Sequence, residues 1–143
     1  MKKFLPIAAL LVSANAVAAP LSVTHDVIAC VKKPARGYAT SWELVMLKKN
    51  ENVVVYQNSS NGNEKDPITS MGVVGTKLIV QHNRGAKETV TFDLAKGNAT
   101  WVEDEYPNNT QLYSDCKSFA VYDFATIRAW FASIVETAEW RNR

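Results

Sequence analysis

Short runs in which apolar and polar residues alternate follow one another from residue 23 to residue 119. Leu44 and Met46, for example, point to one side of their run and Leu47 to the other, which is the two-residue period of a β-strand. The short turns between runs favour an antiparallel meander. We predict seven or eight strands, at 23–31, 41–48, 53–56, 68–74, 77–82, 88–94, 99–103 and 111–119.

Two longer polar stretches interrupt this pattern. Residues 58–67 read NSSNGNEKDP, and residues 103–111 read EDEYPNNTQ. Because Asn, Ser, Gly and Pro favour turns, we predict a long polar loop at each place. A meander of short strands must curl, close or pack on another element to bury its apolar face. We therefore expect a barrel-like sheet.

The apolar period changes near the C-terminal end of the chain. Asp123 is a suitable N-cap, and the residues that follow it have the spacing of one helix face. This predicts an amphipathic helix over about 123–140 that packs on the sheet, with Trp130 at the margin of its apolar stripe. The expected fold class is mainly β (α+β). The stripe consists of Phe124, Ile127, Phe131, Ile134, Val135 and Ala138.

The first 18 residues have the three parts of a secretory signal peptide. Lys2 and Lys3 form a basic start, an apolar run follows over 4–12, and residues 16–18 read AVA. We predict cleavage near Ala18 and a periplasmic or secreted location in a bacterium. Residues 19–143 then form a single domain, and no later apolar stretch approaches the roughly 20 residues of a transmembrane helix.

The two cysteines of the chain, Cys30 and Cys116, allow two interpretations. Residues 27–30 (VIAC) have the letters of a bacterial lipobox, in which Cys30 would be acylated. However, polar residues including Asp26 separate this segment from the apolar run, and lipidation would leave an odd thiol in an oxidising compartment. We therefore predict a Cys30–Cys116 disulfide. Since it would join the first and last strands, it also favours a closed sheet.

Charge and motifs exclude several classes of function. The formal net charge of +2 falls to zero when Lys2 and Lys3 leave with the signal peptide, so nothing suggests nucleic-acid binding. His25 and His82 are the only histidines, and no zinc, nucleophile-elbow or phosphate-loop motif is present. We expect no enzymatic activity, no metal site and no cofactor.

Candidate binding residues lie in the two polar stretches. The densest acidic run of the chain falls in the second stretch. Such a run suits a basic partner surface or Ca²⁺, although a calcium-loop spacing is missing, or, alternatively, a charged hairpin end that prevents edge-to-edge pairing. We place a candidate partner-binding surface at Glu103, Asp104, Glu105, Tyr106, Asn61, Glu64 and Lys65.

The sequence leaves two binding functions open. Small size, polar loops and the lack of catalytic motifs favour a periplasmic module that binds another protein, of the inhibitor or immunity type. Its plan is similar to that of bacterial lysozyme inhibitors and envelope immunity proteins, although the Ser-Gly-x-x-Tyr signature of one inhibitor family is absent and Ser70-Met71-Gly72 is the nearest approach. Strands that are apolar on both faces suggest the alternative, a small carrier of an apolar ligand or lipid.

Overall fold

The computed structural model describes residues 21–33, 42–58, 62–83 and 85–141. The predicted signal peptide and the candidate residue Asn61 lie outside these ranges. In the described part of the chain, no helix has both the length and the apolar character needed to cross a membrane. The elements are β1 (Val27–Lys32), β2 (Glu43–Lys48), a short 3-10 helix η1 (Lys49–Glu51), β3 (Val53–Asn58), β4 (Gly62–Val74), β5 (Lys77–Asn83), β6 (Lys87–Asp93), β7 (Asn98–Glu103), β8 (Tyr106–Phe119) and the helix α2 (Phe124–Arg141).

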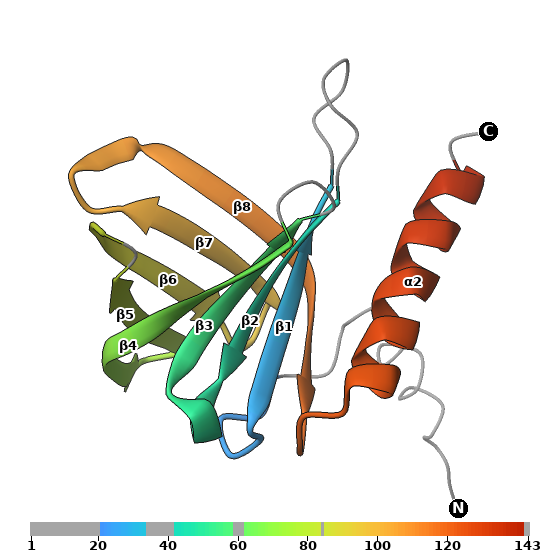
Figure 1. The fold of residues 1–143 in the computed structure, drawn as a ribbon, viewed down its shortest axis with the longest axis horizontal. Coiled ribbons are helices and arrows are strands. Elements are labelled where there is room, and N and C mark those ends of the chain that lie inside the picture. The colour runs from blue at the N-terminus through green and yellow to red at the C-terminus, as the bar shows by residue number, and fades with distance from the viewer. Residues whose placement is uncertain (1–20, 34–41, 59–61, 84, 142–143) are drawn as a thin grey trace, which may run out of the picture.

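The eight strands form a closed antiparallel barrel in which each strand pairs with the next along the chain. The barrel closes where β1 pairs with β8 (Figure 1). The curled meander expected from the sequence is therefore confirmed, and so is the single helix packed on it. A barrel of eight strands has an interior just wide enough to be filled by side chains or to hold one small ligand.

Three predicted strand starts were wrong by more than three residues. β1 begins at Val27 rather than at residue 23, because residues 22–25 form a turn in which the His25 N–H donates to the Ser22 carbonyl. β4 and β8 begin at Gly62 and Tyr106, so most of each predicted loop is strand. β4 pairs with β3 over Gly62–Pro67, and β8 pairs with β7 at Tyr106 and again from Gln111, with a register shift between them. This tertiary pairing overrides the turn-forming composition of the two segments.

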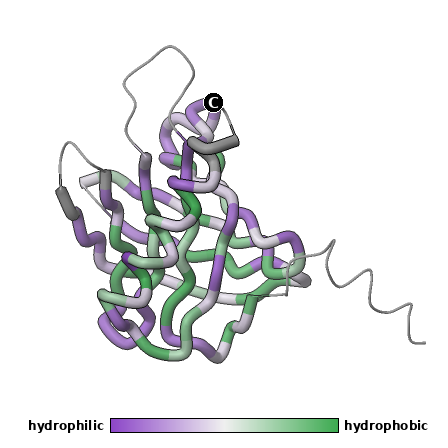
Figure 2. Tube along the Cα trace, turned by 90° about the vertical axis from the view of Figure 1, so that its right-hand side faces the viewer, coloured by the Kyte–Doolittle hydropathy of each residue, from purple (hydrophilic) through white to green (hydrophobic). Residues whose placement is uncertain are grey.

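The barrel interior is apolar over most of its length. Outside the bulges of β4 and β8, every second residue of a strand faces inward, and Figure 2 shows hydrophobic and hydrophilic residues alternating along the chain trace. Leu21 seals one end: it is 7% exposed, and its N–H donates to the Leu94 carbonyl at 2.9 Å. The buried interior residues are Leu21, Ile28, Cys30, Val45, Leu47, Val54, Leu78, Val80, Val90, Phe92, Ala99 and Tyr113.

A second apolar cluster lies outside the barrel, between α2 and the neighbouring strands (Figure 1). It explains why β1 and β2 are apolar on both faces: one face lines the interior and the helix covers the other. Ile127 and the half-buried Trp130 supply the helix side, and Trp130 packs edge-on against Phe119 with 5.5 Å between ring centroids. The cluster's buried members are Val27, Ala29, Val31, Leu44, Met46, Val55, Phe119 and Ile127.

The start of α2 confirms the predicted cap and corrects the predicted stripe. The Asp123 carboxylate accepts the Ala125 N–H at 3.1 Å and the Thr126 hydroxyl at 2.9 Å, as an N-cap should. Phe124, predicted within the apolar stripe, is 59% exposed, whereas Ile127 three residues later is 4% exposed and packs against the barrel wall.

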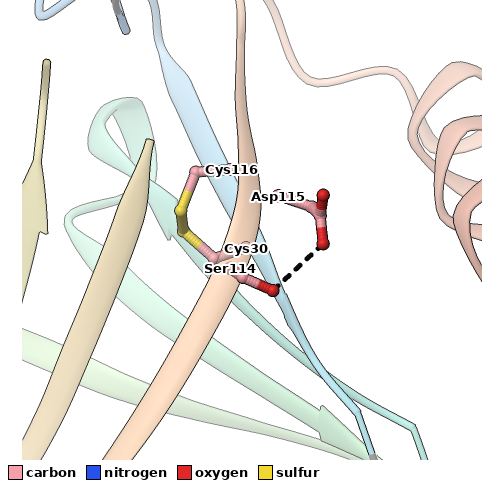
Figure 3. The surroundings of a disulfide bond; sticks show 4 residues. All are labelled: Cys30, Ser114, Asp115 and Cys116. Carbon is pink, nitrogen blue, oxygen red and sulfur yellow. Dashed lines mark hydrogen bonds between the residues drawn. A yellow bond between two sulfur atoms is a disulfide. The ribbon is translucent and has the colours of Figure 1, made fainter. Parts of the chain in front are cut away.

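The predicted disulfide is present between Cys30 of β1 and Cys116 of β8 (Figure 3). Opposite Cys30 the β1–β8 register shifts by a bulge, and Asp115 there adopts a left-handed conformation with φ of 53°. The two Cα atoms are 4.0 Å apart. The cross-link therefore sits on the seam at which the barrel closes.

Asp93 caps the turn between β6 and β7 and makes its stability depend on pH. The Lys96 N–H, the Ala95 N–H and the Lys77 ammonium, in that order, hold the pKa of its carboxyl below the ordinary value. The native state therefore binds fewer protons than the unfolded state near pH 4.

The stabilisation that Asp93 provides should be complete above the unfolded pKa of about 3.9 and disappear as the pH falls through the lower folded value. We expect the difference in unfolding free energy between wild type and Asp93→Asn to shrink between about pH 6 and about pH 2. Urea denaturation across this range measures it. A difference that is constant with pH would contradict the role given to the carboxylate.

Candidate functional site

One end of the barrel, which we call the mouth, carries polar side chains on its inner face. The mouth is the end where the strand pairs β1–β2, β3–β4, β5–β6 and β7–β8 are joined. Inward positions that are apolar deeper in the barrel become polar here. On each of three strands, the next inward residue toward the mouth is polar: Lys32 beyond Cys30 on β1, His82 beyond Val80 on β5, and Glu88 beyond Val90 on β6. The barrel is thus closed and apolar at one end and polar at the other.

A cavity of about 340 Å³ opens at the mouth. Three of its residues are carboxylates and one is an amine, so the lining carries a formal charge of −2. The lining residues are Lys32, Glu43, Tyr56, Glu88, Trp101, Glu103, Asn109 and Gln111.

The amine of the cavity is already engaged at the rim. Lys32 Nζ lies 3.7 Å from Glu43 Oε2 and donates to the side-chain carbonyl of Gln111. The Tyr56 hydroxyl donates to Glu43 Oε1 at 2.6 Å. Lys32 and Glu43 therefore neutralise each other locally, and the excess negative charge of the lining belongs to Glu88 and Glu103.

Aromatic rings form one wall of the mouth. The ring centroids of Tyr56 and Trp101 are 5.0 Å apart, and Trp101 lies 6.0 Å from the His82 ring and 6.4 Å from the Tyr113 ring. Trp101 is half-buried and lines the cavity. An electron-rich ring face beside carboxylates is an arrangement that attracts cations.

Below the cavity, three ionisable side chains meet in the buried interior. His82 Nδ1 lies 2.9 Å from Asp66 Oδ2 and 3.6 Å from Glu88 Oε1. Asp66 and His82 are each 1% exposed. Sequence reasoning missed this cluster, because its members are 6 to 22 positions apart along the chain and only strand register brings them together.

The structure separates the sequence-predicted site residues into three groups. Glu103 lines the cavity, and Glu64 lies on the inner face opposite Tyr56 in the β3–β4 ladder. Asp104, Glu105 and Tyr106 are exposed at the tip of the β7–β8 hairpin, where Asp104 accepts the Thr89 hydroxyl at 2.9 Å.

Lys65 belongs to a different surface. Its ammonium is exposed and lies 3.5 Å from Glu51 Oε1 on the outside of the barrel. There it borders a groove of about 540 Å³ between α2 and the barrel wall. The groove is lined by Leu44, Met46, Lys48, Val55, Gln57, Lys65, Tyr122, Phe124, Ile127, Arg128 and Phe131.

Lys48 is the buried cation of this groove. Its Nζ lies 2.5 Å from Glu51 Oε2 and 3.7 Å from the centroid of the Tyr122 ring. The hydrogen bond from Lys48 is the main reason that the pKa of Glu51 lies below its ordinary value. The groove therefore combines apolar side chains with basic ones.

Comparison of the chain with models of known protein families, with curated proteins and with solved structures finds no match. The function of the protein must therefore be inferred from the chemistry of the mouth and of the groove.

Proposed function

We propose that this protein is an exported, non-enzymatic binding protein whose barrel mouth binds the positively charged group of a small molecule. The observation that carries the proposal is the composition of the cavity: three carboxylates against one lysine that is already paired, beside the Tyr56–Trp101 ring pair. Carboxylates supply charge complementarity, and an indole face attracts an ammonium group by about 0.5–2 kcal/mol.

The filled interior supports a ligand that stays at the mouth. Phe92, Val80 and Val90 are each 0% exposed, so side chains occupy the deeper barrel. A charged group would enter as far as Glu88, whose side chain is 11% exposed, and the rest of the ligand would remain near Glu103.

The disulfide supports the proposed export. Cys30 and Cys116 are bonded, and disulfides persist in oxidising compartments such as the bacterial periplasm. The bond also uses the sulfur of Cys30 that a lipid anchor would require.

A series of phenyl compounds of similar size and different charge tests the proposal. We expect isothermal titration calorimetry to show that phenethylammonium binds at least about tenfold more tightly than 2-phenylethanol or phenylacetate, because one favourable charge contact is worth about 1.4 kcal/mol or more. Binding should weaken as ionic strength rises. Equal affinity for the three compounds, or preference for phenylacetate, would reject the proposal.

Two substitutions in the same hairpin locate the site. Glu103→Gln should weaken phenethylammonium binding about tenfold, since it removes a cavity charge without changing side-chain size. Asp104→Asn is the matched control: its carboxylate is exposed and bonded to Thr89 outside the cavity, so its effect should be less than about twofold. Equal effects of the two variants would place the ligand on the outer surface instead.

A protein partner of the inhibitor or immunity type is the second candidate. The exposed Asp104, Glu105 and Tyr106 extend the acidic surface beyond the cavity, and a partner's lysine or arginine could occupy the mouth. In a pull-down from envelope extract, a partner bound in this way should be lost with Glu105→Lys and displaced by phenethylammonium. Retention under both conditions would exclude this mode.

The alternative of an apolar carrier fits the groove beside α2 better than the barrel. The groove is lined by apolar side chains such as Met46 and Phe131 and by the basic Lys48 and Arg128, which suits a fatty acid rather than an uncharged lipid. Displacement of a fluorescent fatty acid by oleate, abolished in Phe131→Glu, would support this function. Failure of wild type to bind the fluorescent acid would exclude it.

A further inference from the structure

Asp66, His82 and Glu88 meet because of strand register on β4, β5 and β6. Glu88 stands directly opposite His82 in the β5–β6 ladder, and Asp66 lies two residues before Ile68, the β4 partner of His82. Directly opposite and diagonal positions on one face of a sheet are within side-chain contact. Three side chains that bear donor atoms therefore converge on one point inside the barrel.

The distances among the donor atoms match those around a metal ion. One atom from each residue lies within 4.8 Å of the other two, and His82 Nδ1 lies 2.9 Å from Asp66 Oδ2 and 3.6 Å from Glu88 Oε1. Around a tetrahedral zinc ion with bonds of about 2.1 Å, neighbouring donors are about 3.4 Å apart. The two distances from the imidazole lie on either side of this value.

We propose that Asp66, His82 and Glu88 bind a divalent transition-metal ion of the zinc class at the floor of the mouth. An imidazole with two carboxylates is a donor set that suits zinc. With a neutral imidazole the three side chains carry a charge of −2, which one divalent cation balances. Charged groups at this depth are normally paired or coordinate a metal.

The adjoining cavity gives the ion a path of entry and room for a further ligand. Glu88 belongs both to the cluster and to the cavity lining, so an ion can enter from the mouth, and a water molecule or ligand can complete its coordination from the same side. The hydrogen bond between His82 and Asp66 is then the metal-free form of the site. A metal ion that binds Nδ1 takes the place of the hydrogen-bonded proton there, and the imidazole stays neutral because its one proton is then carried by Nε2.

Metal titration of the full mature chain tests this inference. After dialysis against EDTA, we expect ZnCl₂ to bind with 1:1 stoichiometry in calorimetry, whereas MgCl₂, which prefers oxygen ligands and retains its water, gives no comparable heat. CoCl₂ should produce the visible absorption of a four-coordinate site, and zinc should displace it. A wild-type protein with no zinc heat and no cobalt spectrum would overturn the proposal.

Substitutions assign the metal to these residues. Asp66→Asn and Glu88→Gln should each weaken zinc binding at least about tenfold, and His82→Ala about 100-fold. His25→Ala is the matched control, because His25 lies outside the barrel interior, where its Nδ1 bonds Ser118 at 3.1 Å. Zinc binding that is lost with His25→Ala and kept in the other three would overturn the assignment. If circular dichroism shows that the buried variants do not fold, the cobalt spectrum of the wild-type protein decides whether the metal site exists.

The metal site and the proposed ammonium site can fail independently. Asp66 and His82 do not line the cavity, and Glu103 does not belong to the cluster. Asp66→Asn should therefore impair zinc binding while phenethylammonium binding remains, and Glu103→Gln should do the reverse. Because Glu88 is common to both sites, we expect zinc to weaken phenethylammonium binding in wild type.

Discussion

Replacing both Cys30 and Cys116 by alanine is expected to lower the free energy of unfolding by about 2–5 kcal/mol. The bond joins residues 86 positions apart, and for a loop of this size the chain-entropy treatment gives an upper value of about 4.6 kcal/mol. Its position explains why the effect should be large. β1 and β8 are the strands most distant in sequence that must pair, and the cross-link holds them together at the seam of the barrel.

Urea denaturation of the oxidised wild type, the reduced wild type and the double alanine variant measures this contribution. The reduced and the alanine proteins should agree within about 1 kcal/mol, since both lack the same constraint. Ser114→Ala is a control on the neighbouring outer face, where the hydroxyl bonds the exposed Asp115 carboxylate. A loss below about 1 kcal/mol on removing the disulfide would show that the barrel seam closes equally well without it.

The strand pattern was predictable because alternation and burial coincide. The run that became β5 is apolar at Leu78 and Val80, and both side chains are buried in the interior. β4 shows where this reasoning fails. Its first half carries Glu64 and Asp66 at the inward positions, so its period is concealed by polar residues, and local composition alone predicts a loop.

The presence of polar residues at inward strand positions also explains why the candidate site was only partly predictable. Glu103 was identified because acidic residues cluster beside it in sequence, and it does line the cavity. Asp66, His82 and Trp101 have no such local signal, since they come from β4, β5 and β7. A barrel assembles its mouth from inward residues at the ends of many strands. Identifying them requires the register of every ladder, which a single sequence does not determine.

Phe92→Ala is expected to destabilise the protein by about 3–5 kcal/mol. Phe92 of β6 is 0% exposed and is the largest fully buried side chain among the described residues. Its neighbours in the ladders are Leu78 and Ala99, which belong to the same interior cluster. The substitution removes apolar contact and leaves a cavity that closed barrel strands cannot easily collapse to fill.

Phe124→Ala is the control, because it is the same substitution at an exposed position. Phe124 is 59% exposed at the start of α2, so its truncation should cost less than about 1 kcal/mol in the same urea experiment. The cavity left by Phe92→Ala should also bind benzene, as apolar engineered cavities do, whereas wild type should not. Similar losses in the two variants, or benzene binding by the wild-type interior, would mean that the barrel is not filled. A hollow barrel would in turn favour an apolar ligand in the interior over a charged one at the mouth.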